Sequence, residues 1–261
     1  METSLHRELK LLCAGPKAQF EVPVAGYRVD AVVGRRLIEI QHGPLSAIRD
    51  KVRALLASHR VTVVKPIVVE KLLVKQSAPG GEVLQRRLSP KRGQLLDVFD
   101  EMIHFTRVFP HPRLTLEVLL VDVEEWRYPS HGRRRRWRAT DHQVEDQRLV
   151  AVRQKHRLRT AADLRALVEC PLPEPFHTAH LAEALDVRRW MAQRIAYCLH
   201  QTGAILQVGK QENARLYRWQ DRTLARSASE GVETGCPRLR VGLVSRRRTG
   251  LGDWENIGRM P

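Results

Sequence analysis

The sequence has no long apolar run, and this absence argues against a protein that spans a membrane with helices. No stretch approaches the roughly 18 consecutive apolar residues that a membrane-spanning helix needs. The first residues, Met-Glu-Thr-Ser-Leu-His, lack the basic and then apolar pattern of a secretory signal. We therefore expect a cytoplasmic protein that does not enter a membrane, associated with the nucleoid if the source is bacterial.

Cysteine is also scarce. The four cysteines, Cys13, Cys170, Cys198 and Cys236, lie far apart and form no Cys-x-x-Cys pair. Structural zinc sites use closely spaced pairs of ligands, so no zinc site is expected. The spacing fits reduced thiols in a cytosolic chain.

Negative charge is scarce relative to positive charge. The 261 residues include 45 Lys and Arg against 29 Asp and Glu, a net charge of +16. Residues 1–126 hold 19 basic and 15 acidic residues, whereas residues 127–261 hold 26 and 14. A field of this kind attracts polyanions, and DNA is the partner that we expect. The uneven distribution indicates two modules, of which the second is the more basic and would bind the polyanion.

The most informative pattern lies in residues 27–41. Two apolar runs flank a Gly-Arg-Arg turn, which predicts a β-hairpin. Asp30 lies in the first predicted strand and Glu39 in the second. An unpaired charge is costly to bury in such an apolar setting, so each acid needs a partner cation or a metal.

Two interpretations of these acids stay open. Carboxylates from neighbouring strands, with the backbone carbonyl between Glu39 and Gln41, would form the oxygen-rich site that Mg²⁺ prefers. Alternatively, Asp30 and Glu39 lie on the solvent face and pair with Arg28 or Arg35. The residues of the hairpin alone do not decide between the two.

These residues resemble the PD-(D/E)XK, or restriction-endonuclease-like, nuclease superfamily. Its pattern is an acid at the start of a hairpin and then Glu/Asp-x-Lys on the next strand, here Asp30 and Glu39-Ile-Gln41. Two positions depart from it: Val29 stands where Pro is usual, and Gln41 where Lys is commonest, as in Glu-x-Gln variants of the superfamily. The resemblance implies a nuclease that hydrolyses DNA phosphodiester bonds, with Asp30 and Glu39 holding Mg²⁺ (or Mn²⁺) and Gln41 positioning a water.

The predicted order of elements strengthens the resemblance, which covers roughly residues 1–75. Helix, three strands, helix and strand form the αβββαβ core of the superfamily, with a right-handed crossover to the last strand. The expected elements are a helix over 3–13, a strand over 19–24, the hairpin, a helix over 45–58 and a strand over 61–69. A first-helix acid often joins the site in this superfamily, so Glu8 is a third candidate acid.

Other residues near the pattern have two interpretations each. His42 would be a ligand or a base, or else a surface histidine that caps the turn before Gly43-Pro44. Lys65 would approach a phosphate from the end of its strand, or would extend along the surface towards water. In residues 76–126 we expect a helix and a strand that extend the sheet, with no further chemistry assigned.

Residues 127–159 are expected to be a basic linker. Its run Arg133-Arg-Arg-Arg-Trp137 combines dense positive charge with one aromatic ring. Such a run either binds nucleic acid, with Arg134 and Arg135 on phosphates, or is a solvated tether.

Residues 160–221 are expected to form a second, smaller domain. Three predicted helices and a hairpin resemble a winged helix-turn-helix, a generic pattern. Its recognition helix would span 188–202, with Trp190 in the core and the early polar residues at the bases of DNA. The expected nucleic-acid-binding residues are Arg188, Arg189 and Gln193 in this helix, and Lys210 and Arg215 in the wing.

Residues 222–261 are rich in Ser, Gly and Arg, and we expect a mostly disordered basic tail. The sequence thus predicts an α/β nuclease with a restriction-endonuclease-like core and a winged helix. The rival hypothesis is a non-catalytic DNA-binding or regulatory protein on a degenerate nuclease scaffold. A homodimer is compatible with the first hypothesis, because nucleases of the superfamily that cut both strands often act in pairs.

Overall fold

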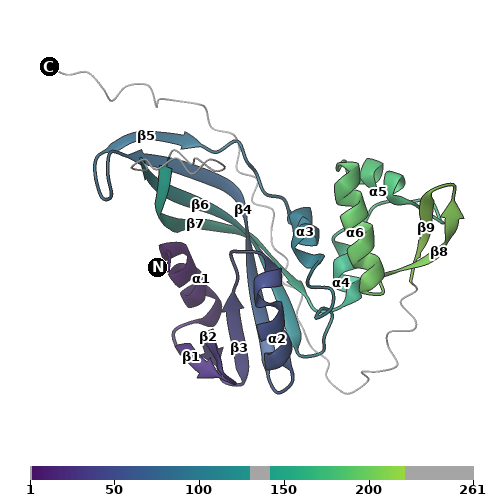
Figure 1. Ribbon diagram of the computed structural model, residues 1–261, viewed down its shortest axis with the longest axis horizontal. Coiled ribbons are helices and arrows are strands. Elements are labelled where there is room, and N and C mark those ends of the chain that lie inside the picture. Colours follow the sequence, from purple (N-terminus) through teal and green to yellow (C-terminus); the bar gives the residue numbers. More distant parts are fainter. Residues whose placement is uncertain (1, 130–141, 221–261) are drawn as a thin grey trace, which may run out of the picture. The chain divides into compact units, whose positions relative to one another are not determined.

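The computed structural model of the chain describes residues 2–129 and 142–220. Within these ranges the protein is a mixed α/β structure with a seven-stranded sheet and a separate two-stranded sheet (Figure 1). The strands of the large sheet are β1 (Gln19–Val24), β2 (Tyr27–Val33), β3 (Arg36–Ile40), β4 (Arg60–Gln76), β5 (Val83–Leu88), β6 (Leu114–Pro129) and β7 (His142–Leu158).

The large sheet is mixed in direction. Strands β1, β2 and β3 form an antiparallel meander, and β3 pairs in parallel with β4 after the helix α2 (Arg49–Leu56). Strand β4 pairs in parallel with β6, and β6 pairs antiparallel with β7. Strands β3 and β5 pair with the same edge of β4, β3 along its first half and β5 along its second half. The predicted order of elements through β4 is observed, including the hairpin that holds Asp30 and Glu39.

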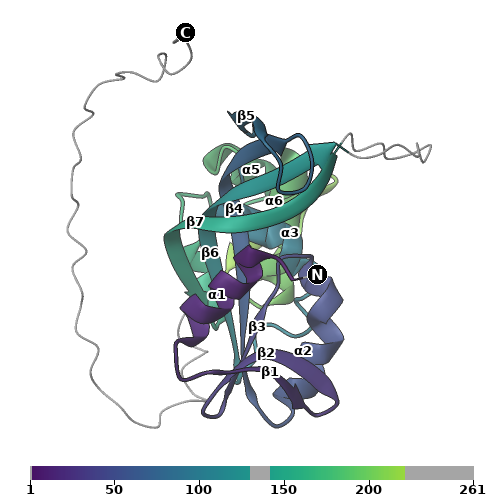
Figure 2. The same ribbon diagram turned by 90° about the vertical axis from the view of Figure 1, so that its left-hand side faces the viewer.

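Helix α1 (Ser4–Ala14) covers one face of the sheet. Thr3 begins the helix by accepting a hydrogen bond from the backbone N–H of His6, and Gly15 ends it with a φ of 76°. Leu5 and Leu9 are fully buried one turn apart against apolar residues of β2, β3, β4 and β6. Burying each such leucine contributes roughly 1.5–3 kcal/mol, which fixes the position of α1 over the sheet (Figure 2).

The opposite face of the sheet carries the larger core. Helix α2 and helix α3 (Val98–Met102) pack there, with Phe99, Phe105 and Phe109 fully buried. The sheet therefore separates two apolar cores, one under α1 and one under α2 and α3.

The prediction of a linker over residues 127–159 is wrong for the residues of this range that the structure describes. Strand β6 continues to Pro129, and β7 pairs with it from Pro129↔His142 to Leu116↔Leu158. Strand β7 is an edge strand whose side chains are mostly solvated, and charged side chains are usual on such an edge. That polarity resembles the composition of a linker. Arg134 and Arg135 lie outside the described residues.

The C-terminal part has the expected order of helices and a hairpin. Its elements are α4 (Ala161–Ala166), α5 (Thr178–Ala184), α6 (Arg189–Gln201), β8 (Ile205–Gln211) and β9 (Ala214–Trp219). These elements do not have a separate core: the thiol of Cys198 donates to the carbonyl of Phe99 at 3.4 Å, and Arg194 pairs with Asp100. The described residues, 2–129 and 142–220, accordingly form one compact unit, and the expected tail at 222–261 lies outside them.

No helix in the described ranges is long and apolar enough to cross a membrane.

Candidate functional site

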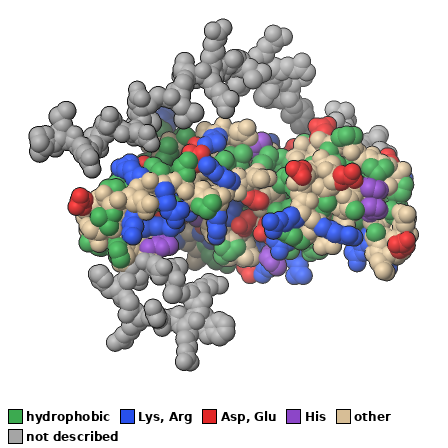
Figure 3. Space-filling view, turned by 90° about the horizontal axis from the view of Figure 1, so that it is seen from above, with side chains coloured by type: hydrophobic (Ala, Val, Ile, Leu, Met, Phe, Trp, Pro, Cys, Tyr) green, Lys and Arg blue, Asp and Glu red, His purple; other side chains and the backbone are tan. Residues whose placement is uncertain are grey.

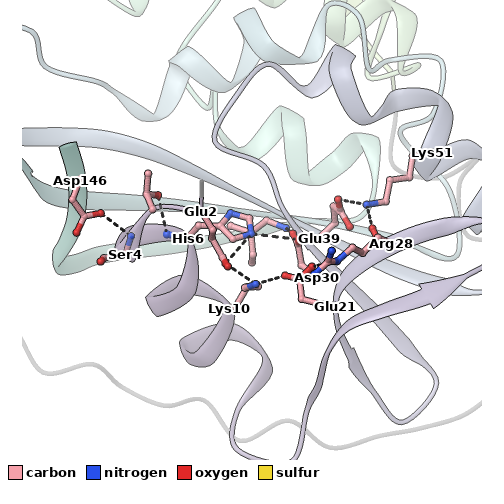
Figure 4. Close-up of polar contacts among 12 residues, drawn as sticks. Glu2, Ser4, His6, Lys10, Glu21, Arg28, Asp30, Glu39, Lys51 and Asp146 are labelled. Carbon is pink, nitrogen blue, oxygen red and sulfur yellow. Dashed lines mark hydrogen bonds and ion pairs between the residues drawn. The ribbon is translucent and has the colours of Figure 1, made fainter. Parts of the chain in front are cut away.

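Asp30 lies in β2 and points towards α1 (Figure 4). Its Oδ2 accepts a hydrogen bond from the backbone N–H of Ile40 at 2.7 Å, and its Oδ1 lies 3.4 Å from Nε2 of His6. Burial raises the pKa of Asp30, but the bonds from His6 and Ile40 outweigh burial and leave the pKa below its ordinary value. Asp30 is therefore a charged, oriented carboxylate.

Glu39 lies one strand away in β3 and is only 6% exposed. Its Oε1 pairs with Nζ of Lys51 in α2, whereas its Oε2 is buried and has no hydrogen-bond partner in the described part of the chain. Burial and the negative charge of Asp30 raise the pKa of Glu39, although Lys51 acts in the opposite direction. The carboxylate is thus paired with Lys51 through one oxygen, while its other oxygen has no hydrogen-bond donor in the described part of the chain.

Lys51 identifies a position that suits a cation. Its Nζ donates to the main-chain carbonyl of Arg28 at 2.5 Å and also contacts Glu39. A carboxylate oxygen and a carbonyl oxygen therefore converge on one ammonium group. The alternative that the acids pair with Arg28 or Arg35 is wrong in detail, because the partners are His6 and Lys51.

Two residues of α1 contribute to the site although no sequence pattern assigned them. His6 faces Asp30, and Lys10, only 5% exposed, pairs with Glu2 and with Glu21 of β1. Burial lowers the pKa of Lys10, but hydrogen bonds and the charges of the two glutamates raise it overall. His6 and Lys10 each follow a buried leucine by one position, so they border the apolar stripe of the helix, and this spacing was the available signal.

Glu8, the expected third acid, is not brought to the site. Its Oε2 accepts a hydrogen bond from the backbone N–H of Leu149 in β7 at 2.6 Å. Because residues two apart on a helix point in different directions, Glu8 cannot share the face of His6. Its observed role is to join α1 to β7.

The segment after β3 is held by main-chain bonds. The backbone N–H of Gln41 donates to Val64 at 2.8 Å, and its side-chain amide donates to the carbonyl of Pro44 at 3.0 Å. His42 is partly buried and its Nε2 has no partner within the described ranges. Burial, with the positive charges of His6 and Lys65, lowers the pKa of His42 to about 4, so the imidazole is neutral at pH 7.

Lys65 fits neither of its expected roles. It lies within β4 and is 4% exposed, and its Nζ donates to the carbonyls of His42 and Gly43 at 3.1 and 2.7 Å. Glu101 of α3 lies 3.0 Å from the same nitrogen. Lys65 therefore fixes the segment that carries His42 and does not reach solvent.

A pocket of about 550 Å³ opens beside Asp30. Its other walls come from the start of the chain and α1, from β1 and β2, from His42 and from Gln147 of β7. Within the described residues, no three or more His, Cys, Asp and Glu side chains form a group that could hold a metal. The carboxylates that line the pocket are those of Glu2, Glu21 and Asp30, whereas Glu39 lies on the neighbouring strand and does not line it.

The expected DNA-contacting residues of the C-terminal part are exposed. Arg188 precedes α6, Arg189 and Gln193 share one face of it, and Lys210 pairs with Arg215 across the β8–β9 hairpin. Trp190 is not in the core as expected but is 45% exposed, with the guanidinium of Arg194 4.7 Å from its ring centroid. The exposed face of α6 therefore combines cations, an amide and aromatic rings.

Residues 3–159 match the model of the family described as Domain of unknown function (DUF8091). The chain belongs to this family. The family's span runs from α1 through β7, so it contains Asp30 and Glu39 and ends directly before α4. An uncharacterized protein of Treponema pallidum (strain Nichols) is 26% identical over 219 residues, which cover 83% of this chain and 85% of that protein. This similarity is longer than the family span and therefore extends into the C-terminal helices. No solved structure matches the chain.

Proposed function

We propose that the chain is a metal-dependent nuclease of the PD-(D/E)XK type that hydrolyses phosphodiester bonds of DNA. The observation that carries the proposal is the buried Oε2 of Glu39, which has no hydrogen-bond partner among the described residues and belongs to a carboxyl group that senses the charge of Asp30. Leaving a carboxylate oxygen buried without a partner is costly, and a divalent cation shared with Asp30 would remove that cost. The αβββαβ order of elements is the second argument.

Asp30 and Glu39 would hold Mg²⁺ or Mn²⁺, together with the Arg28 carbonyl that now accepts from Lys51. Such an ion lowers the pKa of a bound water and stabilises negative charge on the scissile phosphate. For the ion to bind, the ammonium of Lys51 would have to leave the carbonyl. Lys51 would then be available to bind a phosphate oxygen of the DNA.

Other residues of the site would have supporting roles. His42 is neutral at pH 7 and lines the pocket, where its imidazole would accept a proton from an attacking water. Gln41 uses its amide N–H on Pro44, so we assign it to fixing the segment that carries His42, in place of positioning the water. Arg28, which lines the pocket, would bind phosphate.

The C-terminal helices and hairpin would act as a winged helix that binds DNA. The exposed polar face of α6 at Arg189 and Gln193 would enter the major groove, and Lys210 and Arg215 of the hairpin would contact the backbone. The net charge of +16 favours capture of such a polyanion.

The test is cleavage of single-stranded, double-stranded and branched DNA with Mg²⁺ or Mn²⁺. Asp30→Asn and Glu39→Gln are expected to lower the rate at least about a hundredfold, because each removes an ion ligand. The matched control is Asp50→Asn, which neutralises an exposed acid of α2. Intact DNA in every reaction of a folded wild-type protein would overturn the proposal.

A non-catalytic DNA-binding protein is the second candidate, and one observation favours it. Each carboxylate already has a basic partner in the protein, His6 for Asp30 and Lys51 for Glu39. Under this candidate, Asp30→Asn and Glu39→Gln change stability alone, and wild type binds DNA in a salt-sensitive way without cutting it.

A further inference from the structure

We propose that a second pocket, formed at the far ends of β4, β5 and β6, binds the phosphate backbone of nucleic acid. The pocket has a volume of about 280 Å³, and Lys75, Arg87 and Arg127 line it together with His142 and Tyr128. No Asp or Glu lines it. The choice of nucleic acid as the polyanion rests on the proposed function, but these residues take no part in hydrolysis. The pocket is called the basic groove below.

Strand register brings the three cations of the basic groove together. Lys75 of β4 pairs with Arg127 of β6, and Leu73 of β4 pairs with Arg87 of β5. Directly paired residues of neighbouring strands point to the same face, and the strands lie about 4.8 Å apart. The three positive charges therefore lie on one face of three neighbouring strands, with Arg87 displaced by two residues from the Lys75–Arg127 pair, and this spread suits a chain of phosphates better than a single small anion.

The charges of the basic groove are not cancelled. Lys75 and Arg87 are exposed, and neither forms an ion pair with another described residue. Arg127 pairs with Glu125, which is 2% exposed and also contacts Lys71 at 2.5 Å. Because two cations share that one buried acid, the groove keeps a net positive charge.

The basic groove lies on the same face of the sheet as α1 and the Asp30 pocket. Val121 and Val123 of β6 pack in the core under α1, and Glu125 and Arg127 follow them at two-residue spacing. Polar contacts connect the two pockets: Gln147 lines the Asp30 pocket and donates to Glu125 at 2.8 Å, and Glu125 pairs with Arg127 of the basic groove. A nucleic-acid strand in the basic groove would therefore extend over Gln147 towards Asp30. Figure 3 shows Lys and Arg side chains gathered on the part of the molecule that includes β5.

The test compares two double variants of the full chain with equal changes in charge. Lys75→Ala with Arg87→Ala removes two unpaired cations of the basic groove, and Lys17→Ala with Arg35→Ala removes two exposed cations elsewhere. Binding to labelled duplex DNA is measured in EDTA, so that hydrolysis does not contribute. In the groove variant the slope of log affinity against log salt is expected to fall by about 1.8, two phosphate contacts at about 0.9 each. The control variant is expected to keep nearly the wild-type slope. A third double variant, Lys75→Arg with Arg87→Lys, keeps both positive charges and is expected to bind like wild type.

Equal losses in both double variants would show that the whole positive field binds DNA, and would overturn the basic groove. Unchanged binding in the groove variant would do the same, as would wild-type binding to heparin or anionic vesicles but not to DNA or RNA. The result is separable from the nuclease proposal. If the groove variant lost affinity but the wild type cut no DNA, the basic groove would stand and the hydrolytic function would be removed. If the wild type cut DNA but the groove variant bound it normally, the hydrolytic function would stand and the basic groove would be removed.

Discussion

At the scale of single residues, Asp30 and Glu39 differ in pKa although they lie on neighbouring strands. Asp30 accepts a backbone N–H and faces His6, so its pKa is lowered in spite of burial. Glu39 is more completely enclosed and faces the charge of Asp30, so its pKa is raised. Burial and the neighbouring negative charge of Asp30 thus make Glu39 the harder of the two acids to ionise.

His42 makes stability depend on pH. In the unfolded chain its pKa returns to about 6.5, whereas in the folded protein the pKa is about 4. Between these values the unfolded state binds the proton, so stability is lost as pH falls from about 6.5 to about 4, by up to about 3 kcal/mol. His42→Gln is expected to remove this part of the pH dependence, measured by urea unfolding at several pH values. His104→Gln, at an exposed histidine, is the matched control. Equal pH profiles for His42→Gln and wild type would contradict the assignment.

Some site residues were predictable from the sequence and others were not. Asp30 and Glu39 stand out because acids are unusual inside apolar strands, and the turn between the strands indicates that they are neighbours. Their partners Lys51 and His6 lie on helices, where a charged residue beside an apolar stripe is ordinary. Lys65 was misread because a buried lysine is rare and its partner Glu101 is distant in sequence.

At the scale of elements, α1 is joined to β7 by Glu8. Glu8→Ala is expected to cost about 1–2 kcal/mol in the free energy of unfolding, because the N–H of Leu149 loses a charged acceptor. Glu8→Gln keeps an acceptor oxygen and should cost less. Neither variant should change the rate of DNA cleavage per folded molecule. If Glu8→Gln folded like wild type but abolished cleavage, Glu8 would be a site acid after all.

Regular apolar patterns predicted most elements correctly, and the failures have a physical reason. The meander β1–β3, helix α2 and the helices after residue 160 all follow from periodicity and turn residues. Strand β7 does not, because an edge strand needs few apolar side chains and is stabilised by its backbone bonds to β6. The exposure of Trp190 could not be foreseen either, since a helical periodicity does not show which face the rest of the chain covers.

At the scale of the whole described molecule, two positive regions lie outside the candidate site, one on each face of the sheet. The basic groove lies along the sheet from Asp30, and the α6 face belongs to the C-terminal part that packs on α3. The family span contains the first region and ends before the second. A function shared by the whole family would therefore reside in the sheet and α1. Under the proposed function, the C-terminal helices would add to the affinity for DNA.

The central claim is that Asp30 and Glu39 together hold one divalent ion, and Mn²⁺ binding followed by electron paramagnetic resonance tests it without DNA. The wild-type chain is expected to bind one Mn²⁺ at this site. Glu39→Gln should bind it at least about tenfold more weakly, while Asp50→Asn binds it like wild type. Binding of Mn²⁺ should also weaken as pH falls, because protons compete with the ion for the carboxylate of Glu39, whose pKa is raised. Absence of Mn²⁺ binding in the wild type, or equal binding in all three proteins, would contradict the claim.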